Sequence, residues 1–341
     1  MRLNGSFLRN NPDPVHLSLV AKNLPELDCQ LASMAQLKKS KVLITGGSGF
    51  LGSHLCRHLS PKTGEVHAIS RTQQSHSGGD IRWWQVDLDD LGAVRNLFSK
   101  VKPDIIFHLS GLVTAGQSQE FVLPTFHSLL TSTVNLLTVA TEVGCARLIL
   151  IGSLNELMPE LGESIPSSPY AAAKWAGSAY GRMFHALYRT PVVIVRPFMT
   201  YGPGQDVRKL IPHVILSLLE GKSPKLSSGK WEADWIYIDD VIEGFIDTAL
   251  VPNIEGDTFD LGSGVLASVR EVVERLVEIV GCSAPPLFGA LPDRVLEPAR
   301  KAEIGRAFEK LGWKPKVSLG SGLQQTVEWY RARLSTSSMN R

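Results

Sequence analysis

From about Lys41 onward, short apolar runs alternate with stretches of helical period along this 341-residue chain. The apolar runs lie at 41–45, 65–69, 81–86, 105–109, 147–151 and 192–195. Most read as apolar throughout rather than at every second position, which is typical of strands that are buried on both faces. Helical periodicity fills most of the intervals between them, as at 53–59 and 121–143. The pattern predicts an α/β protein with a doubly wound parallel sheet that helices cover on both faces.

The pattern changes at both ends of this region. Before residue 41, apolar residues recur every three or four positions from Leu17 to Leu37, and Pro25 interrupts this stripe, so we expect two short helices. They form either an appendage packed on the main domain or a docking or oligomerisation segment. After about Gln205, proline and glycine punctuate the pattern. The predicted divisions are an N-terminal helical extension (1–40), the main α/β domain (41–204), a smaller C-terminal lobe (205–331) and a flexible tail (332–341).

Composition excludes several classes of protein. With 35 Lys and Arg against 33 Asp and Glu, the formal net charge is only +2, and no dense basic run is present. A nucleic-acid partner is therefore not expected. The four cysteines are scattered, which predicts no metal site and favours a reducing compartment. No run approaches the roughly 20 apolar residues that span a bilayer, and the first eleven residues have no apolar signal core. We expect a cytoplasmic protein without a membrane partner.

A glycine-rich loop follows the first predicted strand and opens the first predicted helix. Its sequence is Thr45-Gly-Gly-Ser-Gly-Phe-Leu-Gly52, with glycines spaced for a tight turn, close approach of a pyrophosphate and close helix–strand packing. The N–H groups at the helix N-terminus would face the phosphates. The competing interpretation is a glycine-rich turn without a ligand. We predict a Rossmann-type dinucleotide site with contacts from Gly46, Ser48, Gly49, Phe50, Leu51 and Gly52.

The residues after the second predicted strand bear on the choice of dinucleotide. An acidic residue there accepts the ribose hydroxyls of NAD, whereas an arginine accommodates the 2′-phosphate of NADP. This chain has Ser70 and Arg71 at that place, so no carboxylate repels a phosphate and Arg71 can pair with it. NADP(H) is therefore expected, with NAD(H) as the alternative and a merely solvated Arg71 as the competing interpretation. After the third strand, Asp87 and Leu88 stand where a carboxylate can receive the adenine amino group.

The order of the motifs resembles that of the extended short-chain dehydrogenases/reductases over about residues 41 to 331. Beside the glycine loop, the similar segments are His108-Leu-Ser-Gly111, Ser153, Tyr170-Ala-Ala-Ala-Lys174, Arg196–Gly204, Asp234–Val241, Phe259–Gly264, Leu311–Pro315 and Gly322–Trp329. Within that family the chain looks most like the NAD(P)-dependent nucleotide-sugar epimerases, dehydratases and 4-ketoreductases. The resemblance implies further cofactor contacts from Leu109, Ser110, Gly111, Tyr170, Lys174 and Pro197.

Tyr170 and Lys174 are four residues apart and share one face of a predicted helix. A phenol ionises at about pH 10, and a lysine ammonium one turn away, together with the nicotinamide charge, would lower that pKa toward neutrality. Ser153, at the carboxyl end of a predicted strand, can hydrogen-bond a substrate carbonyl or hydroxyl. The resemblance assigns the roles: Tyr170 is the acid/base, Lys174 is its activator and Ser153 orients the substrate. The competing interpretation of the Tyr–Lys pair is ordinary helix surface.

The residues after Ser153 separate this chain from the dehydratases that it resembles. Those enzymes follow their serine or threonine with two adjacent acidic residues, whereas this chain has Leu154 and Asn155. Glu156 comes one position later, where its side chain should point in a different direction. Elimination of water from the sugar is therefore disfavoured.

The smaller lobe is expected to hold a nucleotide-diphospho-sugar. Arginine and lysine suit diphosphate recognition, although an exposed surface charge is the competing interpretation for each basic residue. Ala233 stands where family members often carry an arginine, so one diphosphate contact is missing or supplied elsewhere. Asn135 either matches an asparagine of related enzymes or is a packing detail. The predicted substrate contacts are Ser153, Asn155, Lys209, Pro212, Lys225 and Arg294.

Two hypotheses of function use the same catalytic residues. The first is an NADPH-dependent 4-ketoreductase of a nucleotide-linked keto-sugar, which Ser70 and Arg71 favour. The second is an NAD-dependent nucleotide-sugar 4-epimerase. A carbonyl reductase with a non-sugar substrate and a non-catalytic, cofactor-sensing protein are lesser alternatives. The resemblance also implies a homodimer through a four-helix bundle, to which each copy would contribute the helices over 121–143 and 170–188.

Overall fold

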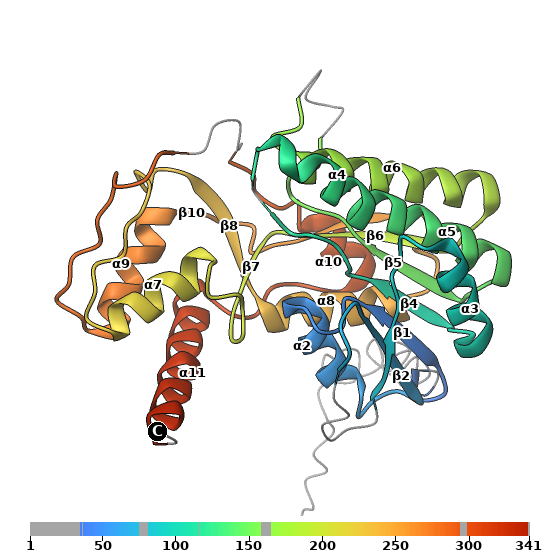
Figure 1. Cartoon of the computed structure of the whole chain (residues 1–341), viewed down its shortest axis with the longest axis horizontal. Helices are drawn as coiled ribbons and strands as arrows, with labels where there is room; N and C mark the ends of the chain where they lie inside the picture. The colour runs from blue at the N-terminus through green and yellow to red at the C-terminus, as the bar shows by residue number, and fades with distance from the viewer. Residues whose placement is uncertain are drawn as a thin grey trace, which may run out of the picture.

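The structure is a computed structural model that describes residues 35, 37–74, 81–114, 116–157, 165–293 and 299–339. Its larger lobe, at the right of Figure 1, is built on one parallel sheet with the strand order β3-β2-β1-β4-β5-β6-β9. The strands are β1 (Lys41–Thr45), β2 (Glu65–Ser70), β3 (Ile81–Gln85), β4 (Ile105–His108), β5 (Arg147–Ile151), β6 (Val192–Pro197) and β9 (Thr258–Leu261). The predicted doubly wound α/β fold is confirmed.

Alternate residues of each strand point to opposite faces of the sheet, and both faces are buried in strands such as β1, β4 and β5. In β1, Val42 and Ile44 pack into one hydrophobic core, whereas Leu43 packs into the other. The neighbouring β4 divides in the same way, with Phe107 in the first core and Ile106 in the second. This double burial explains why the sequence shows continuous apolar runs instead of an alternating pattern.

Helices cover both faces of this sheet (Figure 1). The helices α3, α5 and α6 pack together on one face, and α2 and α8 pack together on the other. The helices of the larger lobe are α2 (Phe50–Leu59), α3 (Leu91–Val101), α4 (Val122–Thr125), α5 (Ser132–Val143), α6 (Pro169–Tyr188), α8 (Ile238–Leu250) and α10 (Gly305–Leu311). A 3-10 turn, η1 (Gln119–Phe121), and a π-helical segment, η2 (Phe126–Thr131), join with α4 and α5 into one continuous helical stretch.

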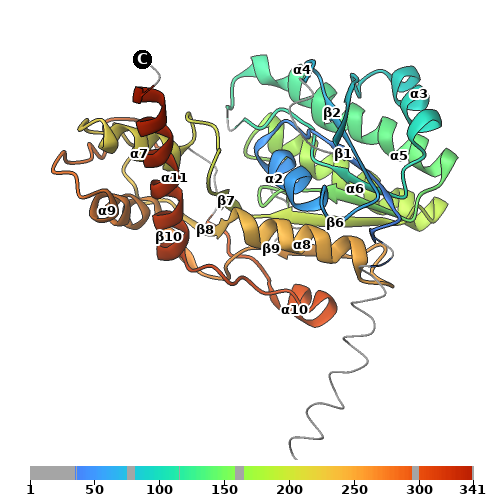
Figure 2. The same ribbon diagram turned by 90° about the horizontal axis from the view of Figure 1, so that it is seen from below.

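The smaller lobe is built on a three-stranded sheet with the order β10-β8-β7. Figure 2 shows the two lobes side by side, with α7, α9 and α11 around the smaller sheet and α8 lying along the larger one. The elements of this lobe are β7 (Met199–Tyr201), α7 (Leu210–Leu219), β8 (Glu232–Tyr237), β10 (Leu266–Ser268), α9 (Val269–Val280) and α11 (Leu319–Met339).

The predicted divisions of the chain need two corrections. A single boundary at residue 205 is too simple, because after β8 the chain returns to the larger lobe, where α8 packs on α2 and β9 pairs with β6. The tail predicted over 332–341 is helical as far as Met339, since no glycine or proline follows Gly322 to stop α11. The predicted N-terminal extension (1–40) lies almost wholly outside the described residues. Within it, the Leu37 side chain is buried in the hydrophobic core.

One helical stretch, Gln119–Val143, is long and apolar enough to cross a membrane by length and composition, with a mean hydropathy of 1.2. The core helix of a soluble protein meets the same criterion. Here Leu136, Leu137 and Ala140 of that stretch are fully buried in the core beneath the sheet. The hydropathy of the α5 part of this stretch therefore has a packing explanation.

Arg147 ties the sheet to the end of α8, at the edge opposite the carboxyl ends of the strands. Its side chain is 8% exposed, and its Nη2 pairs with the Glu255 carboxylate. Its Nη1 donates to the carbonyl oxygens of Thr248 at 2.7 Å and Val251 at 3.0 Å. These carbonyls belong to the last turn of α8, where a helix leaves acceptors without intrahelical partners.

Replacing Arg147 should destabilise the fold. We expect Arg147→Met to lower the free energy of unfolding by about 3 kcal/mol, because it leaves a carboxylate and two carbonyls without their buried partner. Denaturant-induced unfolding measures this loss. The matched control is Arg95→Met, which breaks the exposed Arg95–Glu142 pair and should cost less than about 1 kcal/mol. Equal losses in the two variants would contradict the assignment.

Candidate active site

The glycine-rich loop lies between β1 and α2, at the carboxyl end of β1. Gly46 has a φ of +67°, a left-handed conformation that glycine adopts without steric cost. A Cβ at Gly52 would lie 2.1 Å from the carbonyl oxygen of Gly46, so any side chain there would fill the cradle. Gly49 begins α2 without a side-chain cap, which leaves the first-turn N–H groups of the helix for an anion. The loop therefore fits the pyrophosphate of a dinucleotide.

Ser70 and Arg71 stand at the end of β2, beside the glycine loop. The hydroxyl oxygens of Ser70 and Ser48 are 3.1 Å apart, and Ser70 Oγ also accepts from the Thr72 N–H at 3.2 Å. Arg71 is exposed, and its carbonyl accepts from the Gln85 side chain at 3.1 Å. No carboxylate ends β2, so this edge can accept either a ribose hydroxyl through Ser70 or a phosphate beside Arg71.

Asp87 and Leu88 form the turn that follows β3. Asp87 is exposed and its Oδ1 accepts from the Asp89 N–H at 3.1 Å, whereas the Leu88 side chain is buried in the core. The Asn135 side-chain amide in α5 donates to the carbonyl oxygens of Leu88 at 3.0 Å and Asp89 at 2.9 Å. Asn135 therefore holds this turn in place, which favours the packing interpretation of that residue.

A buried hydrogen-bonded chain fixes the end of β4 next to the glycine loop. Thr45 Oγ1 accepts from the N–H groups of Leu109 at 3.1 Å and Ser110 at 3.0 Å, and it lies 2.9 Å from His108 Nδ1. On its other side, His108 Nε2 is 3.0 Å from Thr133 Oγ1. Burial lowers the pKa of His108 to about 3, so its ring is neutral. The chain positions the Leu109–Gly111 segment, which the sequence predicts to contact the cofactor.

Ser153, Tyr170 and Lys174 come together at the carboxyl end of β5. Ser153 lies in the loop after this strand, and the other two residues lie in the first turns of α6. That helix begins at Pro169, and Ser168 Oγ caps it by accepting from a backbone N–H. The Tyr170 and Ser153 side chains are hydrogen-bonded to each other. Lys174 Nζ donates to the carbonyl oxygen of Ile151 at 2.7 Å. The structure thus unites the three predicted catalytic residues.

Burial governs the protonation of this set. It raises the pKa of Tyr170, and the hydrogen bond with Ser153 opposes the shift only in part. Burial also lowers the pKa of Lys174 to about 8, against the attraction of the Glu156 carboxylate. The predicted lowering of the Tyr170 pKa by Lys174 is therefore not produced by the chain alone, because desolvation of the phenolate dominates. Of the two charges expected to lower the pKa of Tyr170, the positive charge of a bound nicotinamide is the one that would do so.

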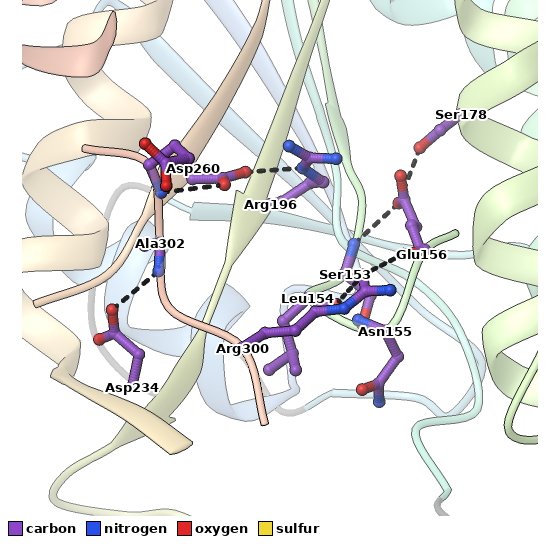
Figure 3. A network of polar contacts seen from close by, with 11 residues as sticks. Ser153, Leu154, Asn155, Glu156, Ser178, Arg196, Asp234, Asp260, Arg300 and Ala302 are labelled. Atoms are coloured by element: carbon purple, nitrogen blue, oxygen red, sulfur yellow. Dashed lines mark hydrogen bonds and ion pairs between the residues drawn. The ribbon is translucent and has the colours of Figure 1, made fainter. Parts of the chain in front are cut away.

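The two residues after Ser153 bring no acid to the site. Leu154 is buried in the hydrophobic core, and the N–H of half-buried Asn155 donates to Ser153 Oγ at 3.2 Å. Glu156 is 1% exposed, and its Oε1 accepts from the Ser153 N–H and from Ser178 Oγ, both at 2.8 Å (Figure 3). Its carboxylate is thus engaged beneath the loop, as expected from its displaced position in the sequence.

Two further residues lie at this loop, Arg300 in contact with its carbonyls and Arg196 beside Gly152, and the sequence did not predict either as a site residue. Arg300 Nη1 donates to the carbonyl oxygens of Leu154, at 2.8 Å, and Glu156. Arg196 in β6 pairs through its Nε with Asp260 Oδ1 at 2.6 Å. Arg300 stands about 145 residues from the loop that it contacts, so no local pattern could reveal the pairing. For Arg196 and Asp260 the sequence offered one indication, because both lie in segments that resemble family motifs, Arg196–Gly204 and Phe259–Gly264.

The substrate contacts predicted for the smaller lobe come from segments other than those of Ser153, Tyr170 and Lys174, and their side chains differ in exposure. Lys209 stands just before α7, and Pro212 is buried within that helix, in the packing of the lobe rather than on its surface. Lys225 is exposed and forms an isolated β-bridge with Leu287. Arg294 lies outside the described residues. Over the described part of the chain, no group of three or more His, Cys, Asp or Glu side chains could hold a metal ion.

Residues 42–262 match the model of the NAD dependent epimerase/dehydratase family. The chain belongs to this family. It is 31% identical over 314 residues to UDP-glucose 4-epimerase of Mycolicibacterium smegmatis, a match that covers 85% of this chain and 98% of the relative. It is 27% identical over 336 residues to dTDP-glucose 4,6-dehydratase of Haemophilus influenzae, covering 87% of this chain and 99% of the relative.

Solved structures of the family superpose on most of the chain. UDP-glucose 4-epimerase of Thermotoga maritima with UDP-glucose has a TM-score of 0.78 at 25% identity, covering 86% of this chain and 99% of that one. UDP-glucuronic acid 4-epimerase of Bacillus cereus, in complex with UDP-glucuronic acid and NAD, has a TM-score of 0.77 at 25% identity, with the same coverage. The predicted family, fold and enzyme class are confirmed, whereas the predicted preference for NADP is not supported by this NAD-bound neighbour.

Proposed function

We propose that the protein is an NAD-dependent 4-epimerase of a nucleotide-diphospho-sugar. The observation that carries the proposal is the union of Ser153, Tyr170 and Lys174 at a dinucleotide cradle, with no acidic pair after the serine. The similarity to a UDP-glucose 4-epimerase over 98% of its length supports an epimerase more than the reductase that the sequence alone favoured. The missing acidic pair argues against a dehydratase.

Tyr170 and Ser153 would share the reacting oxygen of the sugar. When bound, the nicotinamide supplies the hydride acceptor and then the hydride donor. In the first half-reaction, the Tyr170 phenolate takes the proton of the C4 hydroxyl while C4 loses its hydride. Ser153 Oγ accepts from the Asn155 N–H, and the proton that Ser153 shares with Tyr170 would be donated to the C4 oxygen when the sugar is bound. After the 4-keto sugar presents its other face, Tyr170 would return the proton to the C4 oxygen, so that the tyrosine ends the cycle as it began and the sugar undergoes no net oxidation.

A second candidate is an NADPH-dependent 4-ketoreductase. It is supported by Ser70 and the exposed Arg71 at the end of β2, where no carboxylate stands against a 2′-phosphate. The same residues would then work in one direction only: Tyr170 gives a proton to the carbonyl oxygen that Ser153 holds, and C4 receives a hydride.

Removing the Tyr170 hydroxyl tests the acid/base role that both candidate functions assign to this residue. We expect Tyr170→Phe to lower kcat for UDP-glucose epimerisation by about 10³-fold, because it deletes the acid/base group. The Kd for the dinucleotide should stay unchanged. The control is Tyr180→Phe on the same helix, which removes a hydroxyl away from the catalytic residues and keeps the aromatic ring, so kcat should not change. Turnover retained by Tyr170→Phe would disprove the assignment of the acid/base.

The dinucleotide that the protein carries separates the two candidates. An epimerase recycles its cofactor, so denaturing the purified protein should release stoichiometric NAD, identified by chromatography. In thermal-shift titrations of the emptied protein, Arg71→Ala should then leave the stabilisation by NADH and by NADPH unaltered. Arg82→Ala, on the neighbouring strand, is the control. An empty protein that NADPH stabilises selectively, through Arg71, would instead establish the reductase.

We further propose that the protein pairs with a second copy through α4 and α6. These helices pack against each other, and they expose large apolar side chains that a monomer would leave in water. The exposed apolar residues on and between them are Val122, Leu123, Phe126, Tyr180, Leu187 and Tyr188.

A charge in this apolar surface should separate the copies. We expect the wild-type protein to have the mass of a dimer by light scattering, and Leu187→Glu to shift it to the monomer. Val265→Glu is the matched control, because Leu187 and Val265 are both 66% exposed but Val265 lies in the smaller lobe. A monomeric wild type, or a dimer that Leu187→Glu leaves intact, would refute the proposed interface.

A further inference from the structure

The loop that carries Ser153 is buried, although loops usually run over the surface where water satisfies their backbone groups. Ser153 is 6% exposed, Leu154 8% and Glu156 1%. The polar groups of this loop therefore need partners from the protein. Some are met within the loop, since the Glu156 N–H donates to the Ser153 carbonyl at 3.1 Å. Others are met by the side chains of Glu156 and Arg300.

The first of these side chains is that of Glu156 itself. Its Oε1 accepts from the Ser153 N–H and from Ser178 Oγ, which ties the loop to α6 from beneath (Figure 3). Gly152 makes room for this contact, because a Cβ there would lie 2.3 Å from the same oxygen. A carboxylate so deeply buried is costly unless its oxygens are hydrogen-bonded and cations lie near. The charges of Arg196 and Lys174 attract it, while burial raises its pKa.

The second side chain is that of Arg300, which reaches the loop from the segment before α10. Its guanidinium donates to the carbonyl oxygens of Leu154 and Glu156, two positions that water cannot easily serve. Figure 3 shows Arg300 spanning from its own segment to the Ser153 loop, with the Glu156 carboxylate on the far side. The loop is thus held from two sides. The Arg300 guanidinium binds two of its carbonyl oxygens, and the Glu156 carboxyl group binds the N–H of Ser153.

The segment of Arg300 is itself anchored to both sheets. The Ala302 N–H donates to Asp234 Oδ2 of β8 at 3.0 Å, and the Glu303 N–H donates to Asp260 Oδ2 of β9 at 3.3 Å. Asp260 in turn holds Arg196 of β6, next to the loop. Because the segment of Arg300 is fixed to β8 of the smaller lobe and to β9 at the edge of the larger sheet, the contacts of Arg300 fix the Ser153 loop relative to both sheets.

We propose that Glu156 and Arg300 are positioning residues for Ser153, which together fix the loop so that the serine hydroxyl points at the reacting oxygen of the sugar. The proposal rests on the proposed function for what Ser153 does. Neither side chain needs to touch the substrate: Glu156 acts through the amide of Ser153, and Arg300 acts through the two carbonyls that follow it.

Substitutions at Glu156 test the proposal in the full-length protein with its dinucleotide bound. Glu156→Ala should lower kcat for UDP-glucose by about 100-fold, the cost of an ångström-scale misplacement of a catalytic group. KM and the dinucleotide Kd should change by less than about threefold, since the ground-state contacts remain. Glu156→Gln keeps an oxygen acceptor at the same place and should restore kcat to within about fivefold of wild type. A merely structural role would lower Tm but leave kcat of the folded protein unchanged.

A double-mutant cycle identifies Ser153 as the residue through which Glu156 acts. The double variant Ser153→Ala/Glu156→Ala should be no slower than Ser153→Ala alone, because the serine that Glu156 positions is already absent. Additive losses would overturn the proposal. If Glu156→Ala does not fold, Arg300→Ala decides in the same cycle, with an expected loss in kcat of about tenfold at unchanged KM. Arg306→Ala, in α10 and paired with Asp257 away from the loop, is the matched control.

Hydrogen exchange separates a failure of this proposal from a failure of the proposed function. Amide exchange in the peptide over 152–157, followed by mass spectrometry, should be faster in Glu156→Ala and Arg300→Ala than in wild type, and unchanged in Glu156→Gln and Arg306→Ala. This result needs no substrate, so it holds even where the wild type does not turn over UDP-glucose. Equal exchange in wild type and Glu156→Ala would disprove the positioning role whatever the reaction.

Discussion

The site depends on the reversal of strand order at β1. Because β2 lies on one side of this strand and β4 on the other, the loops that leave β1 and β4 diverge at the carboxyl edge of the sheet and open a crevice there. The chain from Thr45 through His108 to Thr133 fixes both sides of the opening with buried hydrogen bonds. The glycine loop, the end of β2 and the Ser153 loop all lie along this one edge, so the topology brings cofactor and catalytic groups together.

Within the site, desolvation competes with charge. Tyr170 and Lys174 are arranged on α6 as the spacing of four predicts. Burial raises the pKa of Tyr170 and lowers that of Lys174, so desolvation opposes the charged form of each side chain. A bound nicotinamide changes this balance, because its oxidised form adds the positive charge that a phenolate needs. Proton transfer is thereby tied to the presence of the oxidised cofactor, which suits an enzyme that must take a proton only when a hydride can also leave.

Features carried by local pattern could be predicted from the sequence, whereas those that depend on distant contacts could not. Apolar runs, the glycine loop and the Tyr170–Lys174 pair are each short enough to read along the chain. The return of α8 and β9 to the larger lobe was missed. Between β8 and β10 of the smaller sheet the chain crosses to the larger lobe and back, and no local pattern marks these crossings. Arg300 was missed because only the fold brings it to the Ser153 loop. For Glu156 the sequence predicted only a side-chain direction that differs from that of an acidic pair. The hydrogen bond between its carboxylate and the Ser153 N–H was not predicted, because it needs the side chain to fold back along its own loop.

A fixed Ser153 loop would suit the proposed epimerase better than the proposed reductase. A reductase delivers hydride to one face of a carbonyl, so its serine and tyrosine need to match one orientation of the sugar. In an epimerase the same serine and tyrosine must bind the C4 oxygen in both half-reactions, before and after the sugar has turned, so these side chains need to stay in place. The contacts of Glu156 and Arg300 with the Ser153 loop would then confine the motion to the substrate, since these polar groups of the buried loop are already paired. On the proposed function, the burial of this loop would therefore serve catalysis as well as stability.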